Sequence, residues 1–596
     1  MNFIRLGTQC NSTLYNSCNS LKFVNIRVNK FSPLVIFLLL SQFLSAQDVS
    51  LIPYPQSYSK KEGVFHLSGN TIIGMNDNSL LPQANYLQTE LQRSSGIAIA
   101  VDPNEANATI DFKIAKDNRP DGAYTLVIQP NRIVITAAAN EGIFYGVVSL
   151  LQLIRSQPAD LVNLNACEIS DAPRYQWRGF MLDESRHFFG REKVKQLLNW
   201  MAFYKLNKFH WHLTDDDGWR IEIKKYPLLA AVGGVGNHTE PHALAKYYTQ
   251  EDIKDIVAYA QDRFITIIPE VDMPGHATAA TRAYPEFSGG SIPGYENYTF
   301  DPANEKTYQF LTDILKEVNG LFPAHMVHLG GDEVALGIQA WAGKPGISDI
   351  IAKNKFTQLT DVEHLFFNRM ADSVNRLGDK VLCWDEAAST DLAPARTIVF
   401  WWRQNVPSQL ELALQKRYHV VLCPRLPLYL DFVQDKSHVS GRRWNGQYFN
   451  SLDEIYNFPD KQLPQDQLQS DLVMGMQANL WTETVGSDKR LDFMTFPRMA
   501  ALAESAWTSA ALKNEDSFDQ RLKADFTWYD RDGIYYFNPF DPSAHPEAID
   551  FRPVVPKRSS RNKHHRKHEA SEHHHRGSTK HKSEHQRSGK AKRPNG

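Results

Sequence analysis

The chain has 596 residues, of which 42% are hydrophobic and 22% charged, and its formal net charge is −2. This length exceeds one ordinary core and predicts two or three folded domains. The charge is uneven, because residues 557–596 hold 13 Lys and Arg against 3 Asp and Glu, which leaves 52 basic against 64 acidic residues in 1–556 and argues against nucleic-acid binding by this acidic body.

The first 46 residues have the pattern of an export signal. Basic residues at positions 22, 27 and 30 precede an apolar run from Phe31 to Leu44, and small residues follow directly before Gln47. The run is short for a membrane span. We therefore expect a signal peptide at 1–46, a mature protein without a transmembrane span, and a periplasmic, cell-surface or secreted location.

Residues 47–172 read as a compact α+β domain. Two strand-like runs, 124–128 and 133–135, flank Gln129-Pro130-Asn131, which is a hairpin signal. The apolar segment 142–156 then predicts a helix. No chemistry stands out in this domain.

From residue 173 to about 540 the pattern changes to apolar runs of strand length that end in polar or aromatic residues. The eight runs are 177–185, 208–216, 264–272, 326–333, 381–386, 397–403, 419–424 and 473–483. Several are continuously apolar, as parallel strands buried on both faces should be. Helical patterns lie between them, so we expect a (β/α)8 barrel, the TIM-barrel fold.

The predicted helices carry recognisable ends. Segment 249–261 opens with Thr249 and Asp252 in the spacing of a capping box. Segment 305–320 ends at Gly320, which predicts a C-cap. Further helices are expected at 194–204 and 362–378. The C-terminal extension 541–596 becomes rich in Lys, Arg, His and Ser from about 557, which predicts disorder.

Polar side chains at the strand ends of a barrel converge, so they can be considered together. They comprise Arg178, Asp183, Arg186, His210, His212, Asp215, Asp216, Glu270, Asp272, His276, Asp332, Glu333, Trp384, Asp385, Glu386, Trp402, Tyr429, Asp431, Trp481 and Glu483. Carboxylates and tryptophans dominate, and no phosphate loop, G-x-S-x-G turn or cysteine-nucleophile signature is present. Acid pairs among tryptophans favour glycoside hydrolysis.

Two other interpretations of these residues are open. Asp332 and Glu333 follow two glycines, and adjacent acids are also common at helix starts. His210 and His212 with Asp215 could form a metal-ligand set. Because polar ends recur on all eight strands, we favour catalysis and expect neither a metal nor a cofactor.

The chain also resembles the β-N-acetylhexosaminidases of glycoside hydrolase family 20. The resemblance lies in LIPYPQSYSKKEGVFHL, GIFYGVVSLLQLI, WRGFMLDESRHFF, KFHWHLTDDDGWRIEIKKYP, IIPEVDMPGHATAA, HLGGDE, WDE, LYLDF, QANLWTE and FPRMAALAESAW, in this order between about 51 and 507. It implies an exo-acting retaining enzyme that removes terminal β-linked N-acetylglucosamine or N-acetylgalactosamine from oligosaccharides or glycoconjugates. In this family the substrate's own acetamido oxygen is the nucleophile.

The resemblance also implies residue roles. Glu333 would be the general acid and then the base, Asp332 would hold the acetamido N–H, and Tyr429 would donate to the acetamido oxygen. The remaining roles concern substrate binding by Arg178, Trp384, Trp402, Asp431, Trp481 and Glu483, and support of Glu333 by Asp215 and His276. Trp402 is preferred to its neighbour Trp401 because it directly precedes Arg403.

Three alternatives stay open on the sequence alone. A longer pocket would release a disaccharide instead of a monosaccharide. A catalytically silent glycan-binding protein could use the same scaffold, although a binding module needs no proton donor such as Glu333. An adhesion protein whose basic tail is the active part is a third class. The sequence does not predict an oligomeric state.

Overall fold

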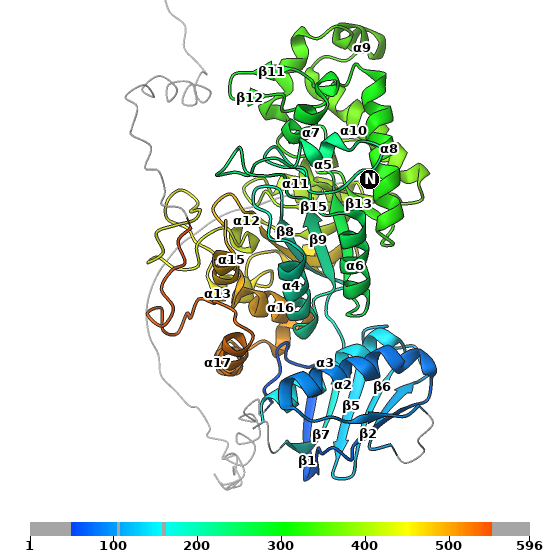
Figure 1. Cartoon of the computed structure of the whole chain (residues 1–596), viewed down its shortest axis with the longest axis vertical. Coiled ribbons are helices and arrows are strands. Elements are labelled where there is room, and N and C mark those ends of the chain that lie inside the picture. The colour runs from blue at the N-terminus through cyan, green and yellow to red at the C-terminus, as the bar shows by residue number, and fades with distance from the viewer. Residues whose placement is uncertain (1–48, 104–107, 158–161, 551–596) are drawn as a thin grey trace, which may run out of the picture. The chain divides into compact units, whose positions relative to one another are not determined.

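The computed structural model describes residues 49–103, 108–157 and 162–550. The expected signal peptide and the basic tail lie outside these ranges. The described part of the chain contains a seven-stranded sheet and a closed eight-stranded barrel (Figure 1). Among its helices, none has both the length and the apolar character to cross a membrane.

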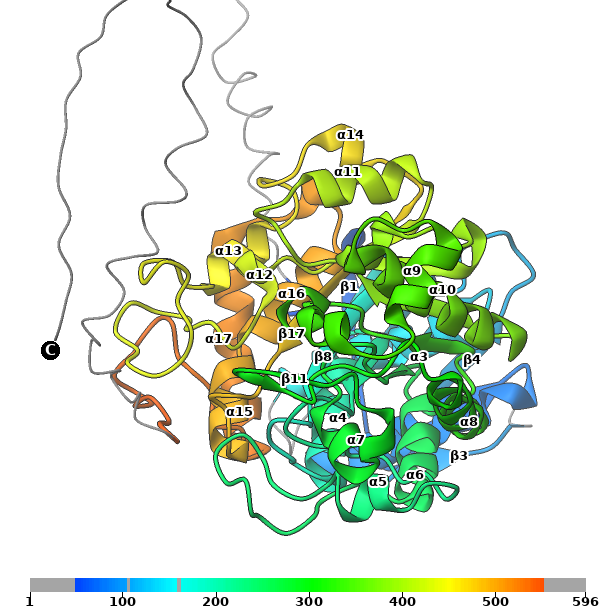
Figure 2. The same cartoon turned by 90° about the horizontal axis from the view of Figure 1, so that it is seen from above.

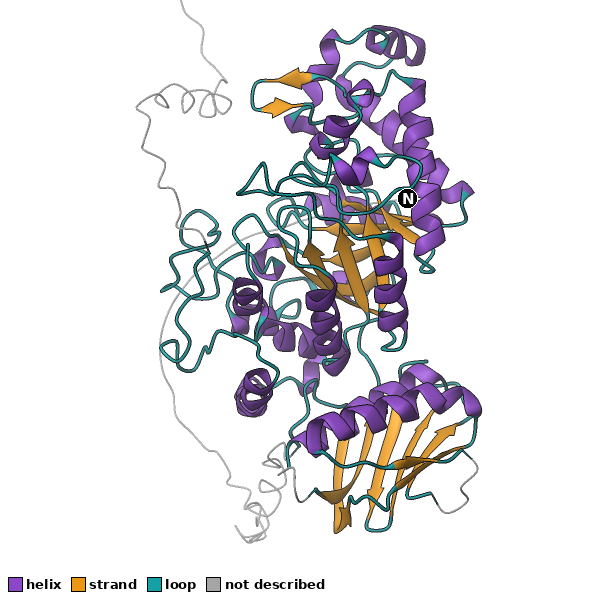
Figure 3. Cartoon of the chain, in the orientation of Figure 1, coloured by secondary structure: helices purple, strands orange, loops and turns teal. Residues whose placement is uncertain are grey.

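The N-terminal domain is a mixed sheet with two helices on one face (Figure 3). Its strands are β1 (Ser57–His66), β2 (Ile72–Met75), β3 (Ala100–Val101), β4 (Ile110–Ile114), β5 (Tyr124–Gln129), β6 (Arg132–Ala137) and β7 (Asn163–Asp171), in the spatial order β1-β7-β5-β6-β4-β2-β3. The helices are α2 (Leu81–Ser95) and α3 (Asn140–Arg155), and α3 packs on β5 and β6. The expected α+β architecture is confirmed.

The predicted hairpin is also confirmed. Strands β5 and β6 pair in antiparallel fashion with Gln129 opposite Arg132, so that Pro130 and Asn131 form a two-residue turn. The inward residues of β6, Ile133 and Ile135, are fully buried. Local turn chemistry and alternating burial therefore act together here.

The barrel consists of eight parallel strands that close in the order β10-β13-β14-β15-β16-β17-β8-β9. Seen from above in Figure 2, helices lie around β8 and β17. They are β8 (Trp177–Asp183), β9 (Lys208–His212), β10 (Thr266–Glu270), β13 (Met326–His328), β14 (Lys380–Trp384), β15 (Thr397–Trp401), β16 (His419–Leu422) and β17 (Val473–Leu480). Seven of them lie within one of the eight apolar runs, and β14 begins one residue before its run, at Lys380. The predicted (β/α)8 barrel is confirmed.

The segments between and after the barrel strands are mostly helical. The helices are α4 (Arg191–Phe203), α5 (Leu228–Ala231), α6 (Gln250–Gln261), α7 (Thr278–Ala283), α8 (Glu305–Leu321), α9 (Ile347–Asn354), α10 (Leu359–Arg376), α11 (Ser408–Gln415), α12 (Arg425–Leu428), α13 (Leu452–Asn457), α14 (Gln465–Leu468), α15 (Asp488–Thr495), α16 (Arg498–Trp507) and α17 (Glu515–Arg531), and a small hairpin pairs β11 (Ser291–Ile292) with β12 (Tyr295–Glu296).

One predicted helix end is confirmed and one is wrong. Thr249 caps α6 with both hydrogen bonds of a capping box to Asp252. Gly320, however, lies inside α8, which continues to Leu321 before Phe322. Both of these apolar side chains are buried, so tertiary packing outweighs the roughly 1 kcal/mol that glycine costs a helix.

Inward-facing apolar side chains fill the barrel and connect to an aromatic cluster. Trp177, Met181, Ile268 and Leu382 belong to the same buried group as four aromatic residues of the strand ends. These four are Trp384, Trp402, Tyr429 and Trp481. The active sites of such barrels form at the carboxyl ends of the strands. The aromatic cluster therefore lies where an active site is expected.

Candidate active site

Two glycines deliver Asp332 and Glu333 to the end of β13. Gly330 and Gly331 both have positive φ, at 66° and 89°, and Glu333 itself has φ 51°. A Cβ at Gly330 would lie 1.8 Å from Oδ1 of Asp272. The turn therefore requires glycine, and short 3-10 turns, Val334–Leu336 and Ile338–Gly343, follow the acids in place of an α-helix.

The two acids have different surroundings. Asp332 is 9% exposed, and burial raises its pKa to about 7, with a further contribution from the charge of Glu270. Its Oδ1 has no hydrogen-bond partner among the described residues. The Glu333 side chain is 45% exposed. One acid is thus held in the interior while its neighbour faces open space.

His276 connects these acids to Asp215. Its Nε2 lies 3.7 Å from Oδ2 of Asp332 and 3.9 Å from Oε2 of Glu333. Its Nδ1 lies 2.9 Å from Oδ1 of Asp215. Burial opposes the charge on His276, but Asp215 raises the pKa of this imidazole well above its ordinary value. A positive ring therefore sits between the Asp215 carboxylate and the catalytic candidates.

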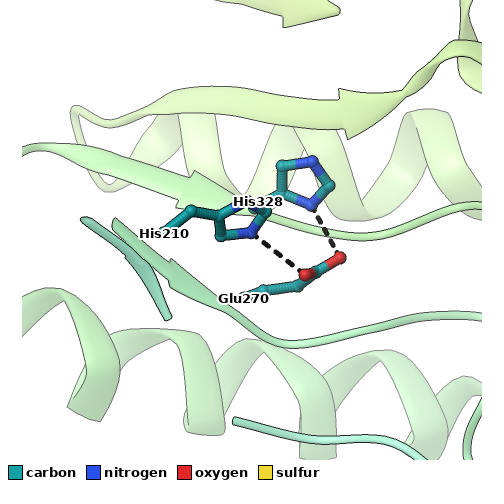
Figure 4. Close-up of side chains that lie close together, drawn as sticks. All are labelled: His210, Glu270 and His328. Atoms are coloured by element: carbon teal, nitrogen blue, oxygen red, sulfur yellow. Dashed lines mark ion pairs between the residues drawn. The ribbon is translucent and has the colours of Figure 1, made fainter. Parts of the chain in front are cut away.

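Below this pair, Glu270 joins three buried histidines from neighbouring strands. His328 Nδ1 lies 2.9 Å from Oε1 and His210 Nε2 3.0 Å from Oε2 (Figure 4). His212 contacts Glu270 through Nδ1 and lies 2.9 Å from Asp215 through Nε2. Against the effect of burial, the histidines hold the pKa of Glu270 well below its usual range.

The same cluster contains the residues that could hold a metal ion. His210 and His212 lie on the same face of β9. Both contact Glu270, which comes from the neighbouring strand β10. Several groups of these residues have donor atoms close enough to hold an ion. Yet the distances are those of hydrogen bonds between the donors themselves, so the geometry is that of a charged hydrogen-bond network.

Three tryptophans and Tyr429 wall the adjoining space. Trp402 and Tyr429 stack with ring centres 6.3 Å apart and planes 12° apart. Trp481 packs 5.9 Å from Trp384 and 6.1 Å from Tyr429. Trp401 is not part of this cluster. The structure therefore gathers the preferred Trp402 with the other candidates.

Carboxylates fix the orientation of two of these rings. Trp384 donates from Nε1 to Glu270 at 2.9 Å, and Trp402 donates from Nε1 to Glu386 at 2.9 Å. Burial raises the pKa of Tyr429 well above its ordinary value, and the charge of Asp332 adds to the effect. The Tyr429 hydroxyl consequently keeps its proton and is available as a donor next to Asp332.

A second group of acids lies beside this wall. Asp431 is fully buried, and neither carboxylate oxygen has a hydrogen-bond partner among the described residues. Burial raises its pKa to about 7, although Arg442 acts in the opposite direction. The Arg442 guanidinium lies 3.3 Å from Asp431 and also contacts Glu483. These oxygens are suited to accept hydrogen bonds from hydroxyl groups.

The prediction that Arg178 binds substrate is wrong. Arg178 is the second residue of β8 and therefore lies at the amino end of the barrel. It is 1% exposed, and its guanidinium donates to the carbonyls of Lys205 and Tyr175 and to the Tyr145 hydroxyl. These donors are used inside the protein, away from the pocket.

Arg186 occupies the position that Arg178 was expected to fill. It follows the carboxyl end of β8, pairs with Asp215 at 2.6 Å, and lies over the Trp481 ring with its guanidinium carbon 5.2 Å from the ring centre. The charge of Glu483 also acts on it. Both arginines belong to the same predicted strand and its end, and only the direction of the strand separates them.

Other groups at the site had no predicted role. Asp272 is buried, and burial together with the charge of Asp332 raises its pKa well above the ordinary value. The Tyr298 hydroxyl lies 3.0 Å from Nε2 of His276 and donates to the Glu333 carbonyl at 3.3 Å. Arg442 and Tyr298 come from loops between elements, where periodicity carries no signal.

Comparison with known proteins agrees with this geometry. The profile of the glycosyl hydrolase family 20 catalytic domain matches residues 175–510, and that of family 20 domain 2 matches residues 48–172. A β-hexosaminidase of Porphyromonas gingivalis is 32% identical over 527 residues, which cover 84% of this chain but 66% of that protein. A β-hexosaminidase of Vibrio furnissii is 34% identical over 484 residues, 77% of each chain.

Solved structures give the same result. The exo-β-N-acetylglucosaminidase of Vibrio harveyi, solved with N-acetylglucosamine, superposes with a TM-score of 0.76 at 31% identity over 83% of this chain and 79% of that one. The Streptomyces plicatus N-acetyl-β-hexosaminidase reaches 0.73 at 29% identity over 83% and 97% of the two chains. Because the family model covers more than half of the chain and the Vibrio furnissii relative is 34% identical over 77% of each chain, the chain is a glycoside hydrolase and belongs to glycoside hydrolase family 20.

Proposed function

We propose that this protein is an exo-acting, retaining glycosidase that removes terminal non-reducing β-linked N-acetylglucosamine or N-acetylgalactosamine from oligosaccharides or glycoconjugates. One observation carries the proposal. Asp332 Oδ1 is a buried acceptor without a hydrogen-bond partner among the described residues, and the charge of Asp332 acts on the hydroxyl donor Tyr429 in the adjoining aromatic cluster. An acetamido group needs this combination, because its N–H donates and its carbonyl oxygen accepts.

The comparisons support the substrate class. Both sequence relatives are named β-hexosaminidases, and the Vibrio harveyi enzyme was solved with the monosaccharide N-acetylglucosamine. The tryptophan wall adds a physical reason. Trp384, Trp402 and Trp481 offer apolar faces for the acetyl methyl and for the C–H face of a sugar ring.

In the first step, Glu333 donates its proton to the glycosidic oxygen while the bond from that oxygen to the anomeric carbon breaks. The acetamido oxygen attacks the anomeric carbon, and a cyclic oxazolinium ion forms. Asp332 accepts the acetamido N–H and balances the positive charge that develops there. Tyr429 donates to the acetamido oxygen and aims it at the carbon.

In the second step, the Glu333 carboxylate takes a proton from water as the oxygen of that water attacks the anomeric carbon. The ring bond to the acetamido oxygen breaks and the amide is restored. Both attacks occur at the same carbon from opposite faces, so the product keeps the β configuration. His276, held by Asp215, stabilises the negative charge that Glu333 carries between the steps.

The hydroxyl groups of the sugar would be held on the other side of the pocket. Asp431 and Glu483 present buried oxygens that have no hydrogen-bond partner among the described residues, and these oxygens would accept hydrogen bonds from the 4- and 6-hydroxyls. Arg186 lies next to Trp481 and Glu483 and supplies a charge-assisted donor to the ring hydroxyls. We also propose that residues 1–46 direct export. The amino-terminal sequence of the mature protein, beginning near Gln47, tests that part.

The full-length chain tests the main proposal with two chromogenic substrates, p-nitrophenyl β-N-acetylglucosaminide and the plain p-nitrophenyl β-glucoside. We expect release from the first only, with β-N-acetylglucosamine as the first anomer seen by NMR. Tyr429→Phe should lower kcat about 100-fold, because it removes one oriented donor. Equal rates on both substrates would show that the acetamido group is not the nucleophile.

A further inference from the structure

Arg425 lies between two tryptophans at the edge of the aromatic pocket. Its guanidinium carbon is 4.6 Å from the ring centre of Trp402 and 4.3 Å from that of Trp444. Its backbone N–H donates to the carbonyl of Trp402 at 3.0 Å. The backbone of Arg425 is thus tied to that of Trp402, and its guanidinium lies against two aromatic rings, whose faces favour a flat cation.

The charge of Arg425 has no close counter-ion. Among the residues that the structure describes, no carboxylate lies within 4.0 Å of this guanidinium. Its side chain donates to the neutral amide oxygen of Asn405 at 2.9 Å, and Nε has no partner in the described part of the chain. Other arginines nearby differ, because Arg186, Arg403 and Arg442 each pair with an acid.

Arg425 is also partly exposed at the edge of the aromatic cluster. Trp444 packs against the aromatic cluster while remaining partly exposed, and its neighbour Tyr448 is exposed. The charge of Glu333 acts on Arg425. In the proposed reaction Glu333 must reach the glycosidic oxygen, so groups beside it on the open side meet the part of the substrate beyond the cleaved bond.

The acids near Arg425 do not cancel its charge during binding. Glu333 lies 3.9 Å from Nε2 of His276 and forms no ion pair with Arg425. Burial, with the charge of Asp385, raises the pKa of Glu386 well above its ordinary value. A substrate therefore meets the positive guanidinium of Arg425 between the rings of Trp402 and Trp444, and this group can bind a planar anion.

We propose that Arg425 belongs to a leaving-group subsite that selects substrates whose sugar next to the cleaved bond carries a carboxylate, that is, a uronic acid. The inference rests on the proposed function and specifies its substrate class. A guanidinium forms two parallel hydrogen bonds with a carboxylate, whereas a neutral sugar offers no such partner. Trp444 supplies an apolar face on which the same sugar ring can lie.

Two disaccharides test the subsite with the full-length chain. Both carry β-N-acetylglucosamine, linked either to glucuronic acid or to the matched glucuronamide, which has the same shape without charge. We expect kcat/KM to be about tenfold higher for the acid, and the preference to shrink as salt is added. Arg425→Gln should abolish the preference, and Arg425→Lys should keep part of it.

Arg443→Gln is the matched control. Arg443 lies on the same loop as Trp444, but its guanidinium contacts backbone carbonyls, including that of His438. We expect this variant to keep the preference of the unaltered chain. Hydrolysis of p-nitrophenyl β-N-acetylglucosaminide checks that each variant is folded. If Arg425→Gln does not fold, the ratio and salt dependence of the unaltered chain decide the question.

Equal rates of the unaltered chain on both disaccharides would overturn the inference. So would an Arg425→Gln variant that loses activity on both substrates in the same proportion, since Arg425 would then only support the Trp402 wall. Failure to cleave the disaccharides and the p-nitrophenyl substrate alike would instead overturn the proposed function, and the subsite with it.

Discussion

Adjacent residues at this site acquire different chemistry from different burial. Asp332 and Glu333 are both simple carboxylic acids, but the glycine turn points one inward and leaves the other half exposed. Asp332 meets His276, Asp272 and Tyr429, whereas Glu333 reaches the open side. The proposed division between holding the acetamido group and moving a proton follows from this difference.

Glu333→Gln should lower kcat/KM for p-nitrophenyl β-N-acetylglucosaminide by about 10³-fold, because the amide cannot donate a proton to the leaving oxygen. The melting temperature should change little, since the side chain is 45% exposed. Steady-state kinetics and thermal unfolding measure both. Glu251→Gln on α6, at a far more exposed acid, is the control. A Glu333→Gln variant with normal turnover would exclude this residue as the acid.

Asp332→Asn should stabilise the fold more at pH 8 than at pH 4.5. Burial raises the pKa of Asp332 from 3.8 to about 7, so its ionisation reduces folding stability as pH rises across that interval, and the full cost is present above it. Asparagine removes this cost. Thermal unfolding at the two pH values measures the difference, with Asp391→Asn at an exposed site as control. The same gain at both values would contradict the prediction.

At the scale of elements, the loop after β13 turns the chain sharply and so places the two acids, which the extended strand could not do. Three strand residues end at His328, and the next three turn the chain so that the acids follow directly. The backbone carries positive φ at Gly330, Gly331 and Glu333. Strained backbone of this kind persists where surrounding contacts hold it, and here Asp272 fills the space beside Gly330.

Gly330→Ala should reduce activity by at least 100-fold and destabilise the protein by about 2 kcal/mol or more. The new Cβ would meet Asp272 at 1.8 Å in addition to the left-handed backbone penalty. Gly378→Ala is a matched control, because Gly378 has φ +93° and nothing within 4 Å of its Cβ. It should cost only about 1 kcal/mol and leave kcat unchanged. Equal effects of the two changes would argue against the clash.

At the scale of the whole described chain, the N-terminal sheet and the barrel share buried polar contacts. Asp171 at the end of β7 accepts from the Tyr124 hydroxyl at 2.8 Å, from Lys205 at 3.2 Å and from the Trp507 indole at 3.0 Å. Arg178 adds its bond to Tyr145 from the same end of the barrel. The arginine expected in the active site thus belongs to the junction between the two domains.

Asp171→Asn should lower the free energy of unfolding by about 3 kcal/mol, because Lys205 would keep a buried ammonium without its charge partner. Urea denaturation measures this, while kcat should stay close to normal since the pocket lies at the opposite end of the strands. Glu168→Gln on the same strand is the control, because its pair with Lys61 is half exposed and worth at most about 1 kcal/mol. Equal losses of unfolding free energy in Asp171→Asn and Glu168→Gln would contradict the prediction that the buried pair at the junction stabilises the fold.

The sequence by itself determined the eight-stranded barrel, the preceding α+β domain and most of the pocket. Continuous apolar runs specify parallel strands, because buried strands need apolar residues on both faces, and the Thr249 capping box is a local interaction between near neighbours. Motifs at the strand ends named Asp332, Glu333, Tyr429 and the three tryptophans, which the structure brings together.

Only the tertiary structure decided the rest. The direction of β8 separates Arg178 from Arg186, and burial of Leu321 carries α8 past Gly320. Tyr298 and Arg442 reach the site from loops and Arg425 from the first residue of α12, and the pKa of Asp332 depends on charges from other elements. These properties arise from groups distant in sequence that share one low-dielectric space, and neither local propensity nor periodicity contains that information.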